Sequence, residues 1–251
     1  MPNHVTTILT IEDAGGVNLA EIRKKFLNDK GQVDLDVILP SPACLKDFNP
    51  HGGVLSKAKA ALGLLPDPKN INGDDFKALT DRMELLNAYR DASTKTSDDD
   101  VKSVIRAIRN YQECGYMYWY DWCTDNWGTK WNCYDQPDDG HPKDATSFQF
   151  QTAWAHPLEM VAKLSRKLPD VTFSVKYADE DLGANCGEYS IKGGTPFNED
   201  IAPSWDAMSA DEKKRRKGFA FNINYGEDAI PAEHGYDENW EYNDDLYEAN
   251  N

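Results

Sequence analysis

The 251-residue chain carries 43 Asp and Glu against 27 Lys and Arg, a formal net charge of −16, and its hydrophobic content of 40% is ordinary for a folded protein. This charge disfavours binding to nucleic-acid phosphates, which depends on Lys and Arg. The N-terminus lacks the basic and apolar regions of a secretory signal, and no apolar run approaches the roughly 20 residues of a membrane span. We therefore expect a soluble cytoplasmic protein that does not enter a membrane.

The first 40 residues predict a strand, a helix and a second strand. Residues 5–12 have strand composition and are followed by Gly15-Gly16. Apolar residues at helical spacing predict a helix over residues 18–28. Residues 33–39 alternate apolar and polar side chains until two prolines follow, which predicts a strand.

Residues 43–115 are rich in Ala and Leu and predict a helical insertion. Apolar residues recur at helical spacing over residues 55–65, 74–90 and 98–113. Ser97 precedes three aspartates, an arrangement that favours a helix N-terminus by capping and by the helix dipole. We expect these helices to interrupt a β-rich scaffold.

Residues 115–128 form the densest aromatic stretch and fit either a strand or a helix. Gly128 ends this stretch, just after Asn126-Trp127, and is a typical helix stop. We expect Trp127 and Trp131 to be structural. Trp and Tyr are enriched at protein interfaces because they bury a large area at small entropic cost. The sequence therefore predicts partner-binding side chains at Tyr116, Tyr118 and Tyr120.

The remaining elements predict the rest of the sheet. Strands are expected at residues 129–134, 146–154, 171–177, 187–192 and 219–225, and helices at 157–168 and 204–216. In the second of these strands, Phe148, Phe150, Thr152 and Trp154 are expected on one face. Two split strand–helix–strand units predict an α+β domain over residues 1–225, a ferredoxin-like antiparallel sheet with helices on one face and the insertion at about 43–115.

At several places the sequence resembles the YubB-type ferredoxin-like family of bacteriophages and conjugative plasmids. The resemblance rests on Asn3-His-Val, on the run from Trp122 to Trp131, on the strand at residues 148–154 and on residues 184–189. Its most specific part is Asn126-Trp-Gly-Thr-Lys-Trp131. The resemblance implies a ferredoxin-like fold and an origin on a mobile element, and therefore a bacterial host cell. It implies no activity and no catalytic residue.

Residues 226–251 predict a loosely ordered acidic tail. From residue 219 to the C-terminus there is no Lys or Arg, and nine acidic side chains follow Tyr225. An acidic segment without periodicity is typical of disorder. Large aromatics are unusual in such a segment, so we expect them to anchor it to the body or to a partner. Trp240 and Tyr242 are the predicted partner-binding residues, and Tyr236 and Tyr247 accompany them.

Cysteine and histidine spacing argues against a metal site, a disulfide framework and familiar catalytic motifs. Cys114, Cys123, Cys133 and His141 are separated by eight, nine and seven residues, whereas structural zinc ligands usually come in tighter pairs. Five scattered cysteines without a Cys-x-x-Cys pair, the other two being Cys44 and Cys186, favour reduced thiols. No hydrolase or phosphate-loop motif is present. Paired carboxylates such as Asp179-Glu-Asp181 carry little information in so acidic a chain. We expect no cofactor and a binding protein rather than an enzyme.

One motif favours nucleic acid. Residues 217–221, Lys-Gly-Phe-Ala-Phe, match the start of the RNA-recognition motif, whose strand aromatics stack on bases, although the match fails at Asn222. The basic cluster beside it could contact phosphates. The nucleic-acid residues on this interpretation are Lys213, Lys214, Arg215, Arg216, Phe219 and Phe221. The competing interpretation, which we favour, is a core strand preceded by a solvated basic helix end.

Three functions follow, in order of preference. The first is a phage or plasmid accessory protein that binds a host macromolecule, in particular a protein, and counters a host defence or a nucleic-acid-processing factor. The alternative is a single-stranded nucleic-acid binder that uses the predicted strand at 217–225. The third is an enzyme without a recognisable signature, one that acts on a nucleotide.

Overall fold

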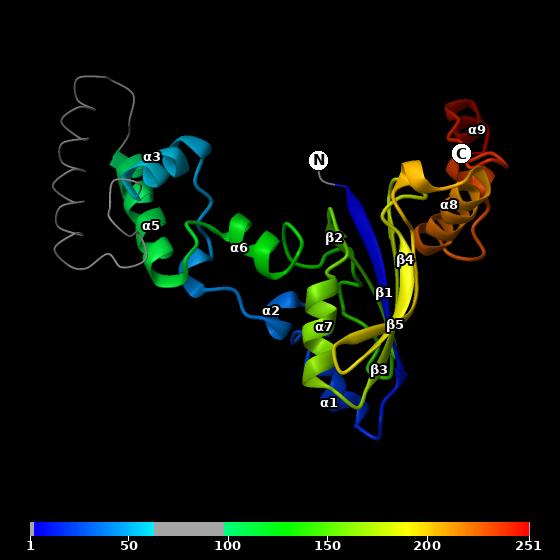
Figure 1. Ribbon diagram of the computed structural model, residues 1–251, viewed down its shortest axis with the longest axis horizontal. Helices are drawn as coiled ribbons and strands as arrows, with labels where there is room; N and C mark the ends of the chain where they lie inside the picture. Colours follow the sequence, from blue (N-terminus) through cyan, green and yellow to red (C-terminus); the bar gives the residue numbers. More distant parts are fainter. Residues whose placement is uncertain (1–2, 63–97, 251) are drawn as a thin grey trace. The chain divides into compact units, whose positions relative to one another are not determined.

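The computed structural model describes residues 3–62 and 98–250 (Figure 1). The chain divides into two compact units, each described here by itself. One comprises Met1–Pro40 and Thr124–Asn251 and contains the sheet, and is called the sheet unit. The other, Ser41–Cys123, is the helical unit.

The sheet unit contains one five-stranded antiparallel sheet in the order β2-β1-β3-β4-β5. The strands are β1 (His4–Asp13), β2 (Ser147–Ala153), β3 (Thr172–Asp179), β4 (Gly187–Lys192) and β5 (Thr195–Ile201). Helix α7 (Leu158–Lys167) connects β2 to β3, and β1 lies between these two strands. This is a split strand–helix–strand unit, and the predicted α+β class is confirmed.

One face of the sheet forms the core beneath α7. Alternate residues of three neighbouring strands are buried there, and α7 buries Met160 and Leu164. Phe26, which follows helix α1 (Leu19–Arg23), packs edge-on against Phe148 with ring centroids 4.9 Å apart. The strand residues on this face include Leu9, Phe148, Phe150, Phe173 and Val175.

The opposite face is mostly polar and is covered in part by α8 (Ala210–Tyr225). Ala220 and Ile223 of this helix pack against Ala178 of β3 in a small buried cluster. Figure 1 shows α7 and α8 on opposite sides of the sheet. The sequence predicted helices on one face of the sheet only. The structure differs in that α8 covers part of the second face.

Residues 204–225 correct two predicted elements. The predicted strand at 219–225 is wrong, because this segment is the second half of α8, and the predicted helix at 204–216 begins later, at Ala210 after the short η2 (Trp205–Ala207). Ser209 caps the helix by accepting from the amide of Glu212. The apolar pattern of this segment is also compatible with a helix. Arg216, Ala220 and Ile223, spaced four and three residues apart, share one buried helix face.

The N-terminal half contains a second correction. The expected helix at residues 18–28 is the short α1 (Leu19–Arg23), and the predicted strand at 33–39 is wrong because residues Leu35–Ile38 form helix α2. Asp34 caps α2 by accepting from the amide of Asp36, and Asn132 Oδ1 accepts from the amide of Leu35 at 2.8 Å. Only Val33 keeps a β-bridge, to Leu27.

Two further differences from expectation lie near β2: one in the chain between α6 (Trp119–Asn126) and β2, the other at the end of β2. Only Tyr134 in the predicted strand 129–134 pairs, through an isolated bridge to Gln151. Trp154 does not share the buried face of Phe148, because its φ is +73° and its side chain is 41% exposed. The predicted strand at 146–154 is otherwise confirmed as β2.

Strand β5 was not predicted. Gly193 and Gly194 join it to β4 by a two-residue turn, with φ of +56° and +84°, and Lys192 pairs with Thr195 across that turn. Two glycines with positive φ are typical of the tight hairpin turn that suits strand twist. The Gly-Gly pair was therefore an available signal, but β5 itself lacks buried alternation.

The C-terminal segment is folded, contrary to the expected loose tail. Beyond Gly226 it forms η3 (Pro231–His234), a bridge between Tyr236 and Tyr242, and α9 (Asp244–Asn250). Trp240 packs on α8 with its ring 5.1 Å from that of Phe221. The ammonium of Lys217 donates to Glu241 at 2.6 Å. Trp240 thus anchors the C-terminal segment to α8, as expected for an aromatic residue of this segment.

The helical unit contains η1 (Ala43–Leu45), α3 (Gly52–Leu62), α5 (Asp98–Cys114) and most of α6 (Trp119–Asn126). Helices α3 and α5 pack through small and branched side chains such as Val54, Ala58, Val104 and Ile108. The helix expected at 98–113 is thus present, and the helix expected at 55–65 is present as far as Leu62, its last three residues lying outside the described residues. The helix expected at 74–90 and the cap at Ser97 lie outside the described residues. The aromatic stretch is helical in α6, and Gly128 follows it with a φ of +74°.

Candidate functional site: an acidic groove at the end of the sheet

A cavity of about 520 Å³ lies at the N-terminal end of β1, within the sheet unit. Its lining comes from β1, β2, α8 and two loops, segments far apart in the sequence. A neighbouring cavity of about 440 Å³ follows the polar sheet face beside α8 and shares Asn224 and Tyr225 with the first. The first cavity, here called the acidic groove, is lined by His4, Thr6, Tyr134, Asp135, Gln151, Glu180, Asn224 and Tyr225.

His4 and Tyr134 form a hydrogen-bonded pair in this groove. The Nδ1 atom of His4 lies 2.7 Å from the Tyr134 hydroxyl, which is also 3.3 Å from the Thr152 carbonyl. Burial, and after it the nearby carboxylates of Glu180 and Asp135, raise the pKa of Tyr134 to about 12. The hydroxyl therefore keeps its proton at neutral pH. The carboxylates of Glu180 and Asp135 produce a negative potential at this side chain, which lines the groove.

Three consecutive carboxylates, Asp179, Glu180 and Asp181, lie at the C-terminal end of β3 beside the groove. Asp179 is only 5% exposed, and it accepts from the amides of Asn3 at 3.1 Å and Asn185 at 2.9 Å. Asn3 also donates to Asp181 at 2.8 Å, while the backbone amide of His4 donates to Glu180 at 3.1 Å. All of these donors are neutral, so they orient the carboxylates without cancelling their charge.

Within residues 3–62 and 98–250, no Lys or Arg forms an ion pair with these three carboxylates or with Asp135. The nearby cation, Lys130, lies instead over the rings of Trp131 and Trp154, at 4.7 and 5.0 Å from their centroids. The negative charge of the groove is therefore not balanced by a neighbouring basic side chain in the part of the chain that the structure describes.

Backbone strain accompanies this charge. Asp135, Trp154 and Asn185 all have positive φ, of +52°, +73° and +44°. Asn185 bonds both to the Trp154 carbonyl, at 3.2 Å, and to Asp179. Non-glycine residues in this conformation cost energy and cluster at functional sites. Their placement beside the groove is a second reason to treat it as the candidate site.

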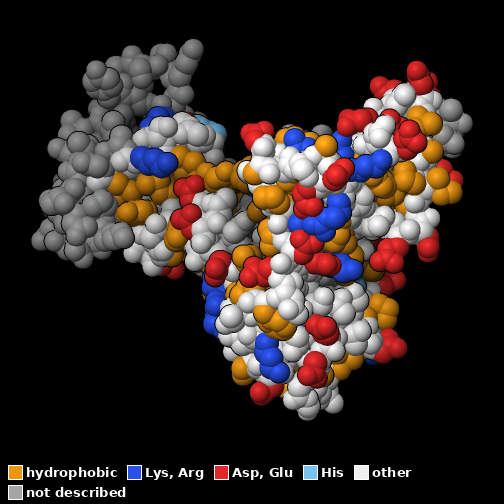
Figure 2. Space-filling view, turned by 45° about the vertical axis from the view of Figure 1, so that its right-hand side comes forward, with side chains coloured by type: hydrophobic (Ala, Val, Ile, Leu, Met, Phe, Trp, Pro, Cys, Tyr) orange, Lys and Arg blue, Asp and Glu red, His pale blue; other side chains and the backbone are white. Residues whose placement is uncertain are grey.

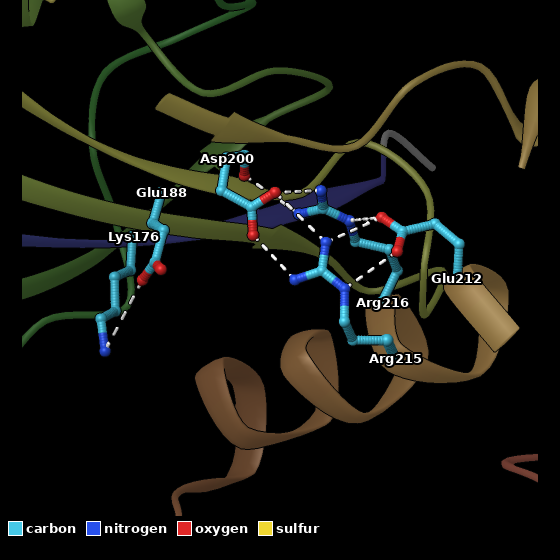
Figure 3. A network of polar contacts seen from close by, with 6 residues as sticks. All are labelled: Lys176, Glu188, Asp200, Glu212, Arg215 and Arg216. Carbon is cyan, nitrogen blue, oxygen red and sulfur yellow. Dashed lines mark hydrogen bonds and ion pairs between the residues drawn. The ribbon is translucent and has the colours of Figure 1, made fainter. Parts of the chain in front are cut away.

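The predicted nucleic-acid residues are engaged elsewhere. Arg216 is 2% exposed, and it bonds to Glu212 at 2.7 Å and to Asp200 of β5 (Figure 3). Arg215 bonds to the same two carboxylates. These guanidiniums lower the pKa values of Asp200 and Glu212 to about 2. The pair of arginines therefore fastens α8 to the edge of the sheet.

The other members of that cluster do not form a base-stacking strand. Phe221 is fully buried in α8, and Phe219 is half-buried against the Ala178 cluster. Lys213 lies 4.7 Å from the centre of the Trp205 ring. Lys214 is exposed on the same helix. The strand that the RNA-recognition motif requires is absent from this segment, so that structural premise is wrong.

The predicted partner-binding residues belong to both units. In the helical unit, Tyr116, Tyr118 and Tyr120 are half-buried, and the last two stack with centroids 5.8 Å apart. In the sheet unit, Trp240 packs on α8, whereas Tyr242 is 55% exposed. Trp127, expected to be structural, is buried, and its indole donates to the Leu39 carbonyl at 3.0 Å.

An exposed aromatic surface borders the groove. Tyr225 is 44% exposed and belongs to both cavities, and its ring centroid lies 4.3 Å from that of His234 with the two rings tilted by 36°. Nine acidic residues occupy the C-terminal segment that follows. Figure 2 shows hydrophobic and acidic side chains intermixed around α8 and α9. The exposed hydrophobic side chains here are Tyr225, Ile230, Tyr242 and Tyr247.

The described residues contain neither a metal-binding cluster nor a membrane-spanning helix. No three His, Cys, Asp or Glu side chains in residues 3–62 and 98–250 are grouped so as to hold a metal ion. None of the described helices is long and apolar enough to cross a membrane.

Comparison with known proteins identifies the fold of one segment. A family model described as the ferredoxin-like domain in Api92-like protein matches residues 127–219. Residues 127–219 are a ferredoxin-like domain. The match runs from Trp127 through β2, α7, β3, β4 and β5 into α8. It does not include β1, which supplies His4. No curated protein and no solved structure matches the chain.

The groove itself was not predicted from the sequence. His4 and Tyr134 stood in separate predicted elements, and nothing in their spacing indicated that they would meet. The run Asp179-Glu-Asp181 was visible, but an acidic run in an acidic chain is not distinctive. The available signal was Asn3-His4, a part of the family resemblance that falls beside the same carboxylates.

Proposed function

We propose that this chain is an accessory protein of a bacteriophage or conjugative plasmid, of the YubB type, that binds a basic host protein through the acidic groove and the aromatic surface beside it. The observation that carries the proposal is the groove beside the exposed ring of Tyr225. Asp135 and Glu180 line it and Asp179 and Asp181 lie next to it, and none of the four forms an ion pair with Lys or Arg among the described residues. Hydrogen bonds orient Asp179, Glu180 and Asp181.

The distribution of charge supports a basic partner. Residues 1–40 and 124–251 contain 31 of the 43 acidic residues but only 16 of the 27 basic ones. The sheet unit therefore carries nearly all of the net negative charge. A charged surface speeds association with an oppositely charged protein, while exposed aromatics supply the contacts that slow dissociation.

The biological role follows from the partner's chemistry. Host factors that process nucleic acid present basic surfaces to phosphates, and an acidic protein can occupy such a surface in their place. Countering a host defence or a nucleic-acid-processing factor is the role that fits a mobile-element protein of this charge.

A pull-down from bacterial lysate at moderate salt tests the proposal. We expect a basic host protein at near-stoichiometric amount, and its recovery should fall as salt rises because the attraction is screened. The double variant Asp135→Asn/Glu180→Gln should lose it. The control Asp29→Asn/Asp170→Asn removes the same charge from two exposed side chains away from the groove and should retain it.

Two results would overturn the proposal. One is recovery of no host protein above background. The other is equal recovery by both double variants, which would place the contact outside the groove. The nucleic-acid alternative predicts co-purifying RNA or DNA, but it has lost the strand on which its aromatic stacking depended.

A further inference from the structure

We propose that the acidic groove receives an arginine side chain of the partner, with the guanidinium between the aromatic residues Tyr134 and Tyr225 and bonded to Asp135 and Glu180. This inference rests on the proposed function and names the group that the groove recognises. Its volume of about 520 Å³ admits one long side chain with solvent.

Guanidinium chemistry fits the lining of the groove. The group is planar, carries five N–H donors in a rigid fork, and stacks on aromatic faces while it bonds to carboxylates. The groove supplies both features, two tyrosines and two carboxylates, together with the Gln151 side chain as a further polar group. A lysine ammonium is a compact, strongly hydrated point charge that uses the aromatic faces less well.

Glu180 and its neighbour Asp179 are held in place before any ligand arrives. The amide of Glu180 donates to the His4 carbonyl at 2.8 Å, and the amide of His4 donates to the Glu180 side chain at 3.1 Å. Neighbouring Asp179 is fixed by Asn3 and Asn185. A preordered acceptor loses less conformational entropy on binding, which favours affinity for a single side chain.

The electrostatics of the groove favour a cation over an anion. Glu180 and Asp135 both act to raise the pKa of the Tyr134 hydroxyl, so a negative ligand there meets two carboxylates. At the same end of the sheet the chain holds its own cation, Lys130, over two indole rings, but leaves these carboxylates without an ion pair among the described residues. Cation binding on aromatic faces is therefore already a feature of this end of the molecule.

The test uses short neutral peptides that contain one arginine, one lysine or one citrulline, titrated into the full chain and followed by two-dimensional NMR. Citrulline keeps the shape of arginine without its charge. We expect the arginine peptide to shift groove resonances and to bind about tenfold more tightly than the citrulline peptide, with lysine between them. Glu180→Gln should weaken arginine binding about tenfold, whereas Asp170→Asn should leave it unchanged.

Variants of Tyr225 distinguish the contribution of aromatic stacking to arginine binding from the contribution of charge. Tyr225→Phe retains the ring and should retain binding, whereas Tyr225→Leu should weaken it. Equal binding of the three peptides, or no effect of Glu180→Gln, would overturn the arginine site. If lysate capture still depended on Asp135 and Glu180, the proposed function would survive that failure. If the arginine peptide bound but no host protein was captured, the arginine site would stand and the proposed function would fall.

Discussion

Trp240 lies directly over Gly218 of α8: a Cβ placed on Gly218 would be 3.1 Å from Cζ2 of the indole. Trp240 adopts a φ of +62°, a strained conformation for a residue other than glycine. The contact therefore helps to fasten the C-terminal segment to α8, together with the Lys217–Glu241 ion pair, and Gly218 leaves room for the indole ring.

Replacement of Trp240 should release this segment. We expect Trp240→Ala to cost less than the ~3–5 kcal/mol of a fully buried aromatic, since Trp240 is only half-buried. Faster hydrogen exchange of amides 231–247, with β1 and β3 unaffected, would report local release. Ile230→Ala, at a side chain 54% exposed, is the control. Equal exchange in the two variants would contradict the anchoring role.

The two adjacent arginines of α8 should differ sharply in their contribution to stability. Arg216 is 3% exposed in its side chain and Arg215 is 50% exposed, although both bond to Asp200 and Glu212. Removing the Arg216 side chain leaves a space in the buried face of α8 and deprives the Asp200 carbonyl of its donor. Exposed pairs contribute about 0–1 kcal/mol. Urea unfolding should therefore show a large loss for Arg216→Ala and a small one for Arg215→Ala; comparable losses would refute the assignment.

His156 should make the folded state sensitive to mild acid. Its ring bonds to Thr7 at 3.0 Å and to Tyr189 at 2.7 Å and stacks on Tyr177 at 4.6 Å, and desolvation lowers its pKa to about 3. Because the folded-state pKa lies below that of the unfolded chain, its contribution is present above about pH 6.5 and is lost as the pH falls from 6.5 towards 3.

The slope expected from this one histidine is at most about 1.4 kcal/mol per pH unit. His156→Gln should reduce the pH dependence of the unfolding free energy between pH 6.5 and 5, whatever its effect at pH 7.5. His51→Gln, at a side chain 63% exposed, provides the comparison. An unchanged slope in His156→Gln would show that the folded protein protonates this ring readily.

The β4–β5 turn offers a test with neighbouring glycines. A Cβ on Gly194, at φ +84°, would lie 2.4 Å from Cγ of Arg166, whereas a Cβ on Gly193, at φ +56°, would have nothing within 4 Å. Asn tolerates positive φ. We expect Gly193→Asn to leave the melting temperature nearly unchanged and Gly194→Ala to lower it, with a cost above ~1 kcal/mol. The reverse order would contradict the turn geometry.

Cys44 and Cys114 should be linked by a short bifunctional thiol reagent such as dibromobimane. Their Sγ atoms lie 3.7 Å apart within the helical unit, although the residues are 70 positions apart in the chain. Burial raises the pKa of Cys44 to about 11, so the reaction should quicken as the pH rises and more thiolate forms. Peptide mapping should find the bridge between these two cysteines, and Cys44→Ser should abolish it; a bridge involving Cys123 or Cys186 instead would contradict the placement.

The sequence by itself determined the elements whose hydrophobic period is unambiguous. Strand β1, strands β2 to β4, and helices α5 and α7 lie where alternating or helical spacing placed them, since each buries one face against a large core. Tertiary structure decided between helix and strand in segments whose apolar spacing fits both. Residues 219–225 alternate like a strand, but Ala220 and Ile223 at helical spacing pack on Ala178. Likewise, the Asn132 side chain binds the first turn of α2 from across the fold.

The candidate site was decided almost entirely by tertiary structure. His4, Tyr134, Glu180 and Tyr225 come from four distant parts of the chain, and only the strand order β2-β1-β3 and the docking of α8 bring them to one groove. Composition fixed the net charge of −16, yet charge alone does not say which carboxylates are already paired. Pairing depends on distances of a few ångströms between segments remote in sequence, and only the folded chain sets those distances.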